Sequence, residues 1–164
     1  MKKWRSIGGF ALVALLVATG CARPFSQAAL DQVNRGVTIA ELQNDPDHYT
    51  GKVVMLAGII VNTKNTKEAT VIEVLERPMG RSGEPLDTDE TRGRFLIVST
   101  RYLDAAVYHP GRRITVIGEA AGVKELPLGE IQYHYPVVAP KELHLWEPYS
   151  GPRFSIGVGV FHAF

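Results

Sequence analysis

Cys21 is the residue whose chemistry is most clearly set by its neighbours. It directly follows three small residues at positions 18–20, which are Ala, Thr and Gly. Before them stand a basic region over residues 2–5 and an apolar stretch over residues 7–17. The apolar stretch is shorter than the ~20 residues that a membrane-spanning helix requires. Residues 1–20 are therefore predicted to be a signal peptide.

The order of these segments resembles the bacterial lipobox, although Ala18 stands where leucine is more usual. The resemblance implies cleavage before Cys21 and attachment of lipid to its thiol. Cys21 is the only cysteine in the chain, so it cannot form an internal disulfide, and a free thiol would be a liability in an oxidising compartment. The alternative is a type I signal peptide or an uncleaved anchor in which Cys21 is incidental.

The residue after Cys21 and the overall charge bear on the compartment and the partners. Ala22, and not Asp, follows the cysteine, which by resemblance to the enteric sorting pathway implies the outer membrane, and we expect its periplasmic face. The chain has 18 basic and 17 acidic side chains, and loss of residues 1–20 leaves 15 and 17. A balanced charge predicts no nucleic-acid partner. The expected partner is the membrane, reached through acyl chains on Cys21.

The sequence offers little material for catalysis or metal binding. The histidines form no HExxH or paired-ligand pattern, and no second cysteine can join them. Ser99, Asp104 and His109 are a conceivable catalytic set, but nothing in their spacing singles them out. The acidic loop over residues 84–90 lacks the alternation of an EF-hand. We therefore expect no catalytic residue, no metal site and no cofactor. The five histidines are His48, His109, His134, His144 and His162.

Four aromatic side chains are the candidate binding residues: Tyr102, Tyr133, Tyr135 and Trp146. Aromatic rings stack on sugars, and barrels with oligosaccharide-binding surfaces are a known architecture. The same rings could equally cap a small hydrophobic core. Both interpretations stay open at the level of sequence.

Hydrophobic periodicity predicts the elements that would carry these residues. Thr38 and Glu41 have capping-box spacing, which predicts a short helix over residues 38–48 that breaks near Pro46. β-Branched runs then predict five strands, the first of which is bent at Gly58. A short helical turn is predicted over residues 101–108. The predicted strands cover residues 53–61, 70–76, 94–99 and 112–120, with a last strand in two pieces, 135–139 and 143–146.

These elements predict an all-β fold, a small five-stranded OB-like barrel over residues 38–147. A lipidated tether is expected over residues 21–37, with partial order near Leu30 and Val33. Residues 148–164 are predicted to form a strand-like tail, because apolar residues alternate with small ones from residue 153 onward. We expect this tail to pair with its own domain. The alternative is β-augmentation of a protein partner or of a second copy through residues 153–164.

An ordered set of short segments within residues 38–147, together with Cys21, is similar to one family of envelope proteins. The segments are Asn44–Lys52, Gly58–Val61, Thr70–Val74, Gly93–Phe95, Leu103–Arg112, Ile114–Gly118, Tyr135–Val138 and Leu143–Trp146. They resemble the Slp family of Gram-negative outer-membrane lipoproteins, the starvation-inducible kind. The resemblance implies an envelope role under starvation or stress, with no established biochemical activity and no catalytic residues.

Taken together, these features predict a non-enzymatic outer-membrane lipoprotein whose barrel contacts proteins or envelope polymers. The alternative function is a periplasm-facing module that binds a glycan or a small molecule through its aromatic residues. A concave pocket with clustered aromatics would favour this alternative, and a flat apolar patch would favour the contact role.

Overall fold

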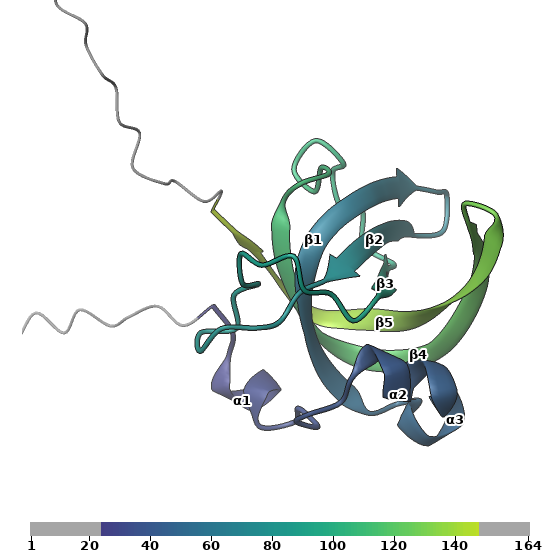
Figure 1. The fold of residues 1–164 in the computed structure, drawn as a ribbon. Coiled ribbons are helices and arrows are strands. Elements are labelled where there is room, and N and C mark those ends of the chain that lie inside the picture. The colour runs from purple at the N-terminus through teal and green to yellow at the C-terminus, as the bar shows by residue number, and fades with distance from the viewer. Residues whose placement is uncertain (1–23, 148–164) are drawn as a thin grey trace, which may run out of the picture.

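Five strands close into a barrel in the computed structural model, which describes residues 24–147 (Figure 1). Their order around the barrel is β1-β2-β3-β5-β4, and only β3 and β5 pair in parallel. This arrangement confirms the predicted all-β, OB-like fold. The predicted signal peptide, Cys21 and the tail over 148–164 lie outside the described residues. The strands are β1 (Val53–Asn65), β2 (Thr70–Glu76), β3 (Arg94–Ser99), β4 (Arg113–Leu128) and β5 (Ile131–Trp146).

β1 belongs to both sides of the barrel. Its first half, from Val53 to Ile59, pairs with β4, and its second half, from Gly58 onward, pairs with β2. A side chain at Gly58 would collide with the Leu75 carbonyl oxygen of β2. The strand can therefore change its neighbour at this position because it carries no Cβ there. The bend that the sequence predicts at Gly58 is the place where the two pairings meet.

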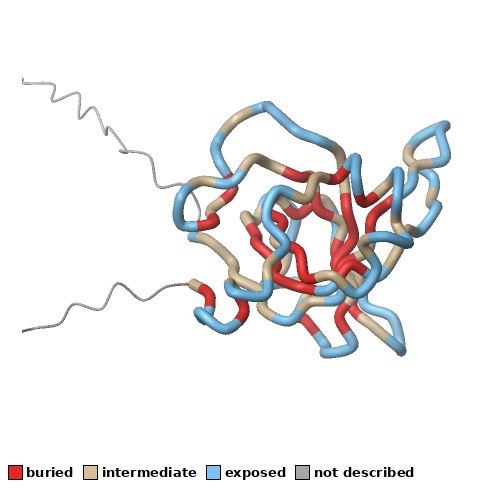
Figure 2. The backbone as a smooth tube through the Cα atoms, turned by 90° about the horizontal axis from the view of Figure 1, so that it is seen from below, coloured by how far each residue is buried: buried red, intermediate tan, exposed pale blue. Residues whose placement is uncertain are grey.

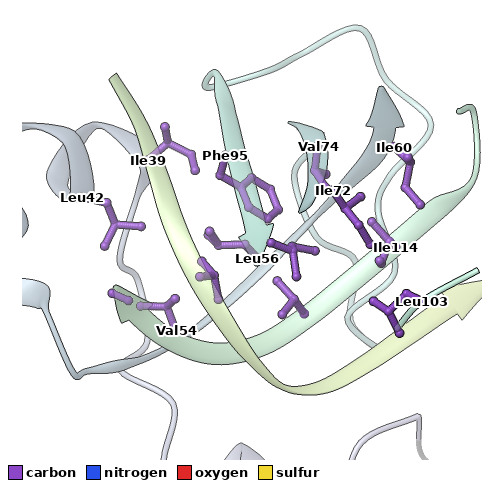
Figure 3. Packing of buried hydrophobic residues seen from close by; sticks show 14 residues of the cluster. Ile39, Leu42, Val54, Leu56, Ile60, Ile72, Val74, Phe95, Leu103 and Ile114 are labelled. Atoms are coloured by element: carbon purple, nitrogen blue, oxygen red, sulfur yellow. The ribbon is translucent and has the colours of Figure 1, made fainter. Parts of the chain in front are cut away.

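The barrel interior is filled by aliphatic side chains around Phe95, and both ends are closed (Figure 3). Ile39 and Leu42 come from helix α2 (Ile39–Asn44) and cover one end, next to Val54. Leu103 comes from the loop between β3 and β4 and lies at the other end. Figure 2 shows the buried residues along the barrel wall and the exposed ones mainly in the loops. Each fully buried aliphatic side chain contributes roughly 1.5–3 kcal/mol.

The predicted helix over 38–48 consists of two short helices, α2 and α3 (Pro46–Tyr49), which meet at Asp45. The capping box is present. The Thr38 backbone N–H donates to the Glu41 carboxylate at 2.7 Å, and the Glu41 N–H donates to the Thr38 hydroxyl at 3.3 Å. These bonds to Thr38 hold the pKa of Glu41 below its usual range. The caps explain why six residues suffice for a helix that covers the barrel end.

Residues 24–37 correct the expectation of a tether over 21–37. From Pro24 onward the chain is folded, with helix α1 (Gln27–Leu30) capped by Ser26. Phe25 and Ala29 are buried in a second apolar cluster with Val53 and Ile117, on the outside of the barrel wall. The prediction failed because the few apolar residues of this segment show no periodicity of their own. These residues pack against an apolar surface that exists only when the barrel has folded.

β4 and β5 also continue past the barrel as a long hairpin, whose strands over residues 121–134 were not predicted. The paired residues run to Leu128 and Ile131, around a tight turn at Gly129, whose φ of +62° favours glycine. Pro140 lies at a shift in register opposite Gly118, as expected for a residue that lacks an N–H. Most residues of this hairpin extension, the β4–β5 arm, are exposed. The arm therefore has no buried face, and its sequence lacks the alternation of apolar and polar residues from which strands are predicted.

The loop between β3 and β4 is a turn and not a helix. The N–H groups of Val107 and Tyr108 both donate to the Asp104 carbonyl oxygen at 2.9 Å, and no further helical bonds follow. The buried N–H of Leu103 donates to the Thr70 hydroxyl at 3.1 Å. A second bond, from the Thr63 hydroxyl to the Tyr108 carbonyl oxygen at 2.6 Å, also holds the loop over the barrel end. The predicted short helical turn is therefore present only as the single turn that begins at Asp104.

We expect Gly58→Ala to destabilise the protein by about 1–3 kcal/mol, because the added methyl group meets the backbone of β2. Gly80→Ala is the matched control, since the atoms nearest to its added methyl belong to the flexible Glu84 side chain and not to backbone. It should change stability by no more than about 0.5 kcal/mol. Urea unfolding monitored by circular dichroism measures both values, and equal stability of the two variants would contradict the role of Gly58.

Candidate functional site

Two of the predicted aromatic residues, Tyr133 and Tyr135, lie together on the outer face of the sheet formed by β2, β3 and β5. Their ring centroids are 4.8 Å apart in an edge-to-face arrangement. The Tyr135 hydroxyl donates to Glu73 Oε1 at 3.1 Å, and Arg94 donates to the same oxygen at 2.6 Å. The Tyr133 hydroxyl accepts the backbone N–H of Arg94 at 3.0 Å. Three strands are therefore connected by one polar network.

Tyr135 is the buried member of this network, whereas the side chains of Arg94 and Glu73 are partly exposed. Tyr135 is only 3% exposed, and burial, followed by the charge of Glu73, raises its pKa. The hydrogen bond from Arg94 to Glu73 raises the pKa of the arginine. Both protonated groups bond to the Glu73 carboxylate, and the burial of Tyr135 leaves its ring closed to a ligand. The arrangement is suited to fixing strands and not to stacking on a ligand.

Tyr102 and Trp146 lie elsewhere. Tyr102 is 74% exposed in the loop between β3 and β4. Trp146 ends β5, and its Nε1–H donates to the Thr115 hydroxyl at 2.9 Å, which in turn donates to the Gly83 carbonyl at 2.7 Å. The structure thus brings together two of the four predicted binding residues and does not form one platform from all four.

The conceivable catalytic set does not form a joint site. Ser99 accepts the N–H of Arg101, Asp104 accepts the N–H of Ala106, and His109 contacts the Pro110 carbonyl oxygen, so each side chain is engaged close to its own position. Among residues 24–147, no three His, Cys, Asp or Glu side chains gather as metal ligands would. His144 instead lies edge-to-face with Trp146, at a centroid distance of 4.6 Å.

A cleft of about 870 Å³ lies between the N-terminal segment and the loop after β2. One wall is formed by residues 24–37 and the other by residues 79–83, while Met55 of β1 and Trp146 lie between them. Its volume falls within the range of small-molecule sites. Sequence reasoning missed this cleft because one wall belongs to the segment expected to be a tether. The signal that could have found it is Ile117, an apolar exception in the otherwise regular alternation of β4, which the N-terminal segment covers.

The family model described as "Outer membrane lipoprotein Slp family" matches residues 18–157. The chain belongs to this family. An Escherichia coli relative, "Outer membrane protein Slp", is 21% identical over 134 residues, covering 82% of this chain and 71% of the relative. A Haemophilus influenzae relative, described as an uncharacterized protein, is 33% identical over 96 residues, which span 58% of this chain and about half, 52%, of that protein. As a member of the Slp family, the chain belongs to the class of outer-membrane lipoproteins. No helix among residues 24–147 is long and apolar enough to cross a membrane.

Two solved structures are similar to part of this Slp family member at a low level. The small single-stranded DNA-binding protein from Streptomyces coelicolor has a TM-score of 0.40 and 10% identity, covering 58% of this chain and 94% of its own. The Plasmodium falciparum SSB in complex with ssDNA has a TM-score of 0.32 and 16% identity, with the same coverages. Likenesses at this level carry no conclusion about what the Slp barrel binds.

The raised pKa of Tyr135 gives a prediction for stability at alkaline pH. Stability from the protonated hydroxyl is fully present below the unfolded pKa, near 10, and is lost as the pH rises through the higher folded pKa. Tyr135→Phe should therefore lower the free energy of unfolding by roughly 1–2 kcal/mol at pH 7, and less above pH 10.

Urea unfolding at a series of pH values from 7 to about 11 tests this, with the exposed Tyr102→Phe as the control that should match the unmodified protein. Parallel curves for Tyr135→Phe and the unmodified chain at all pH values would contradict the bond between Tyr135 and Glu73.

Proposed function

We propose that this Slp family member is a non-enzymatic envelope lipoprotein, anchored by acyl chains on Cys21 to the periplasmic face of the outer membrane. Its barrel contacts proteins or envelope polymers next to the bilayer. Family membership over residues 18–157 supports the class and the membrane. The order of basic, apolar and small residues before Cys21 supports cleavage and acylation. A role under starvation or stress rests on the family resemblance alone.

One observation carries the contact role: Phe25, which is packed into the folded domain, is only four residues after Cys21. Phe25 is 4% exposed, and the next residue, Ser26, donates from its backbone N–H to Glu142 of β5 at 3.0 Å. Four residues span at most about 14 Å even when fully extended. An anchored Cys21 therefore holds the barrel against the lipid surface, which favours contacts made there over a long reach across the periplasm.

The alternative, a module for a glycan or small molecule, keeps one supporting observation. Trp146, one of the predicted binding residues, lines the cleft of about 870 Å³. The pair Tyr133 and Tyr135 supports it less, because the Tyr135 ring is buried and its hydroxyl is bonded to Glu73.

Cys21→Ser should abolish acylation and release the chain from the membrane. The physical reason is that acyl chains contribute ~0.8 kcal/mol per buried CH₂ and two or more are needed for stable anchoring. Metabolic labelling with a fatty acid, together with the mass of the purified chain, measures the modification. A Cys21→Ser chain that still takes up label and remains with the outer membrane would refute the proposed anchor, and Ser26→Ala is a control that leaves the acylation site intact.

For the tail we propose that residues 153–164 pair with their own domain, the expectation carried by their alternating sequence. Deletion of these residues should then lower the melting temperature by roughly 3–8 °C. An unchanged melting temperature, combined with loss of crosslinked complexes from intact envelopes, would instead assign the tail to a partner or to self-association.

A further inference from the structure

The cleft between the N-terminal segment and the loop after β2 concentrates positive charge. Arg35, Arg81 and Arg92 line it, and none of its lining residues is acidic. Within residues 24–147, no carboxylate forms an ion pair with any of these three guanidinium groups. Two carboxylates near the cleft accept backbone N–H groups: Glu84 accepts that of Ser82 at 2.9 Å, and Glu76 of β2 accepts that of Arg92 at 2.8 Å. Loss of residues 1–20 would leave a net acidic chain, so these arginines form a local cationic region.

The rest of the lining combines apolar side chains with the polar residues Gln27, Asn34 and Ser82. Met55 and Trp146 lie on the outer wall of the barrel, and Leu30, Val33 and Val37 extend this surface along the N-terminal segment. Methionine adapts its shape to what it contacts, and the Trp146 nitrogen is already bonded to Thr115, which leaves its ring as apolar surface. Apolar walls beside unpaired arginines suit a ligand that is itself half apolar and half anionic.

Both walls are fixed before any ligand arrives. The loop wall is bound to β4 through the Thr115 hydroxyl, which donates to the Gly83 carbonyl at 2.7 Å. Gly83 has a φ of +89°, and a side chain there would meet Met55. The opposite wall is bound to β1, because the Asn34 backbone N–H donates to the Val53 carbonyl at 2.8 Å. A preformed cleft avoids the cost of ordering its walls on binding.

We propose that this cleft binds one anionic phospholipid, with the phosphate on the three arginines and part of an acyl chain against Met55 and Trp146. Guanidinium groups pair with phosphate through two parallel hydrogen bonds. The apolar walls distinguish this ligand from free phosphate. Pro24 lines the cleft and is only three residues after Cys21. Anchoring of Cys21 would therefore place the cleft next to the bilayer, which supplies the phospholipid. That choice of source rests on the proposed anchoring.

Trp146 itself can report on the cleft. The chain has two tryptophans, Trp4 and Trp146, so Trp4→Phe makes Trp146 the only one whether or not the signal peptide is removed. The full chain is purified from membranes and mixed with phosphatidylcholine vesicles that contain a minority of phosphatidylglycerol. Bromine atoms, which quench tryptophan fluorescence on contact, are placed on the acyl chains of one lipid or the other. We expect stronger quenching when the phosphatidylglycerol is brominated.

Arg81→Glu should weaken this quenching by about tenfold in apparent affinity, which corresponds to the loss of one charged contact of ~1.4 kcal/mol. Arg101→Glu is the matched control, because it makes the same charge change at an exposed residue of the loop between β3 and β4 and should leave quenching unchanged. Circular dichroism melts confirm that both variants fold.

Three results would overturn the proposal. They are equal quenching by either brominated lipid, complete relief of quenching by inorganic phosphate, and quenching that appears only after deletion of residues 153–164. The last result would assign the cleft to the tail. The mass of Cys21 in the same sample reports separately on the anchor, so a failure of lipid binding is distinguishable from a failure of acylation.

Discussion

The barrel depends on the backbone hydrogen bonds that β1 makes to two different strands on either side of Gly58. Those two ladders form two of the five strand interfaces that close the barrel. The interface between β3 and β5 contains only two paired positions, at Leu96 and Ile97 of β3. The outer polar network lies across this short seam. Glu73 of β2 binds both Arg94 of β3 and Tyr135 of β5. Side-chain hydrogen bonds thus connect the strands where few backbone positions are paired.

Much of this fold could be predicted because each strand has one face in the barrel. Buried and partly exposed residues alternate along β2, and the observed strand has the predicted bounds, Thr70–Glu76. The bend at Gly58 and the cap at Thr38 were also readable, since each depends on residues close together in sequence. The exposed β4–β5 arm was not readable, because both of its faces meet solvent and each strand finds its partner only in the other.

The site was less predictable than the fold, because its contacts join residues far apart in sequence. Nothing near Tyr135 indicates that its hydroxyl meets Glu73, 62 positions away. Aromatic content alone therefore could not separate a stacking platform from a ring that fixes strands. The cleft depends on a contact that is even harder to predict from the sequence, because Phe25 packs on Ile117 at the outer wall of β4.

The two ends of the described chain lie on one side of the barrel, and this defines an orientation for it. Pro24 and Trp146 line the same cleft, so the described chain begins and ends on one side (Figure 1). The β4–β5 arm extends toward the opposite side, where Ile131 at its tip is 59% exposed. If Cys21 carries the anchor, the short link to Phe25 turns the cationic cleft toward lipid and the arm away from it. The segment that was expected to be a passive tether would then set the orientation of the whole domain, because its buried side chains prevent the barrel from turning freely on the membrane.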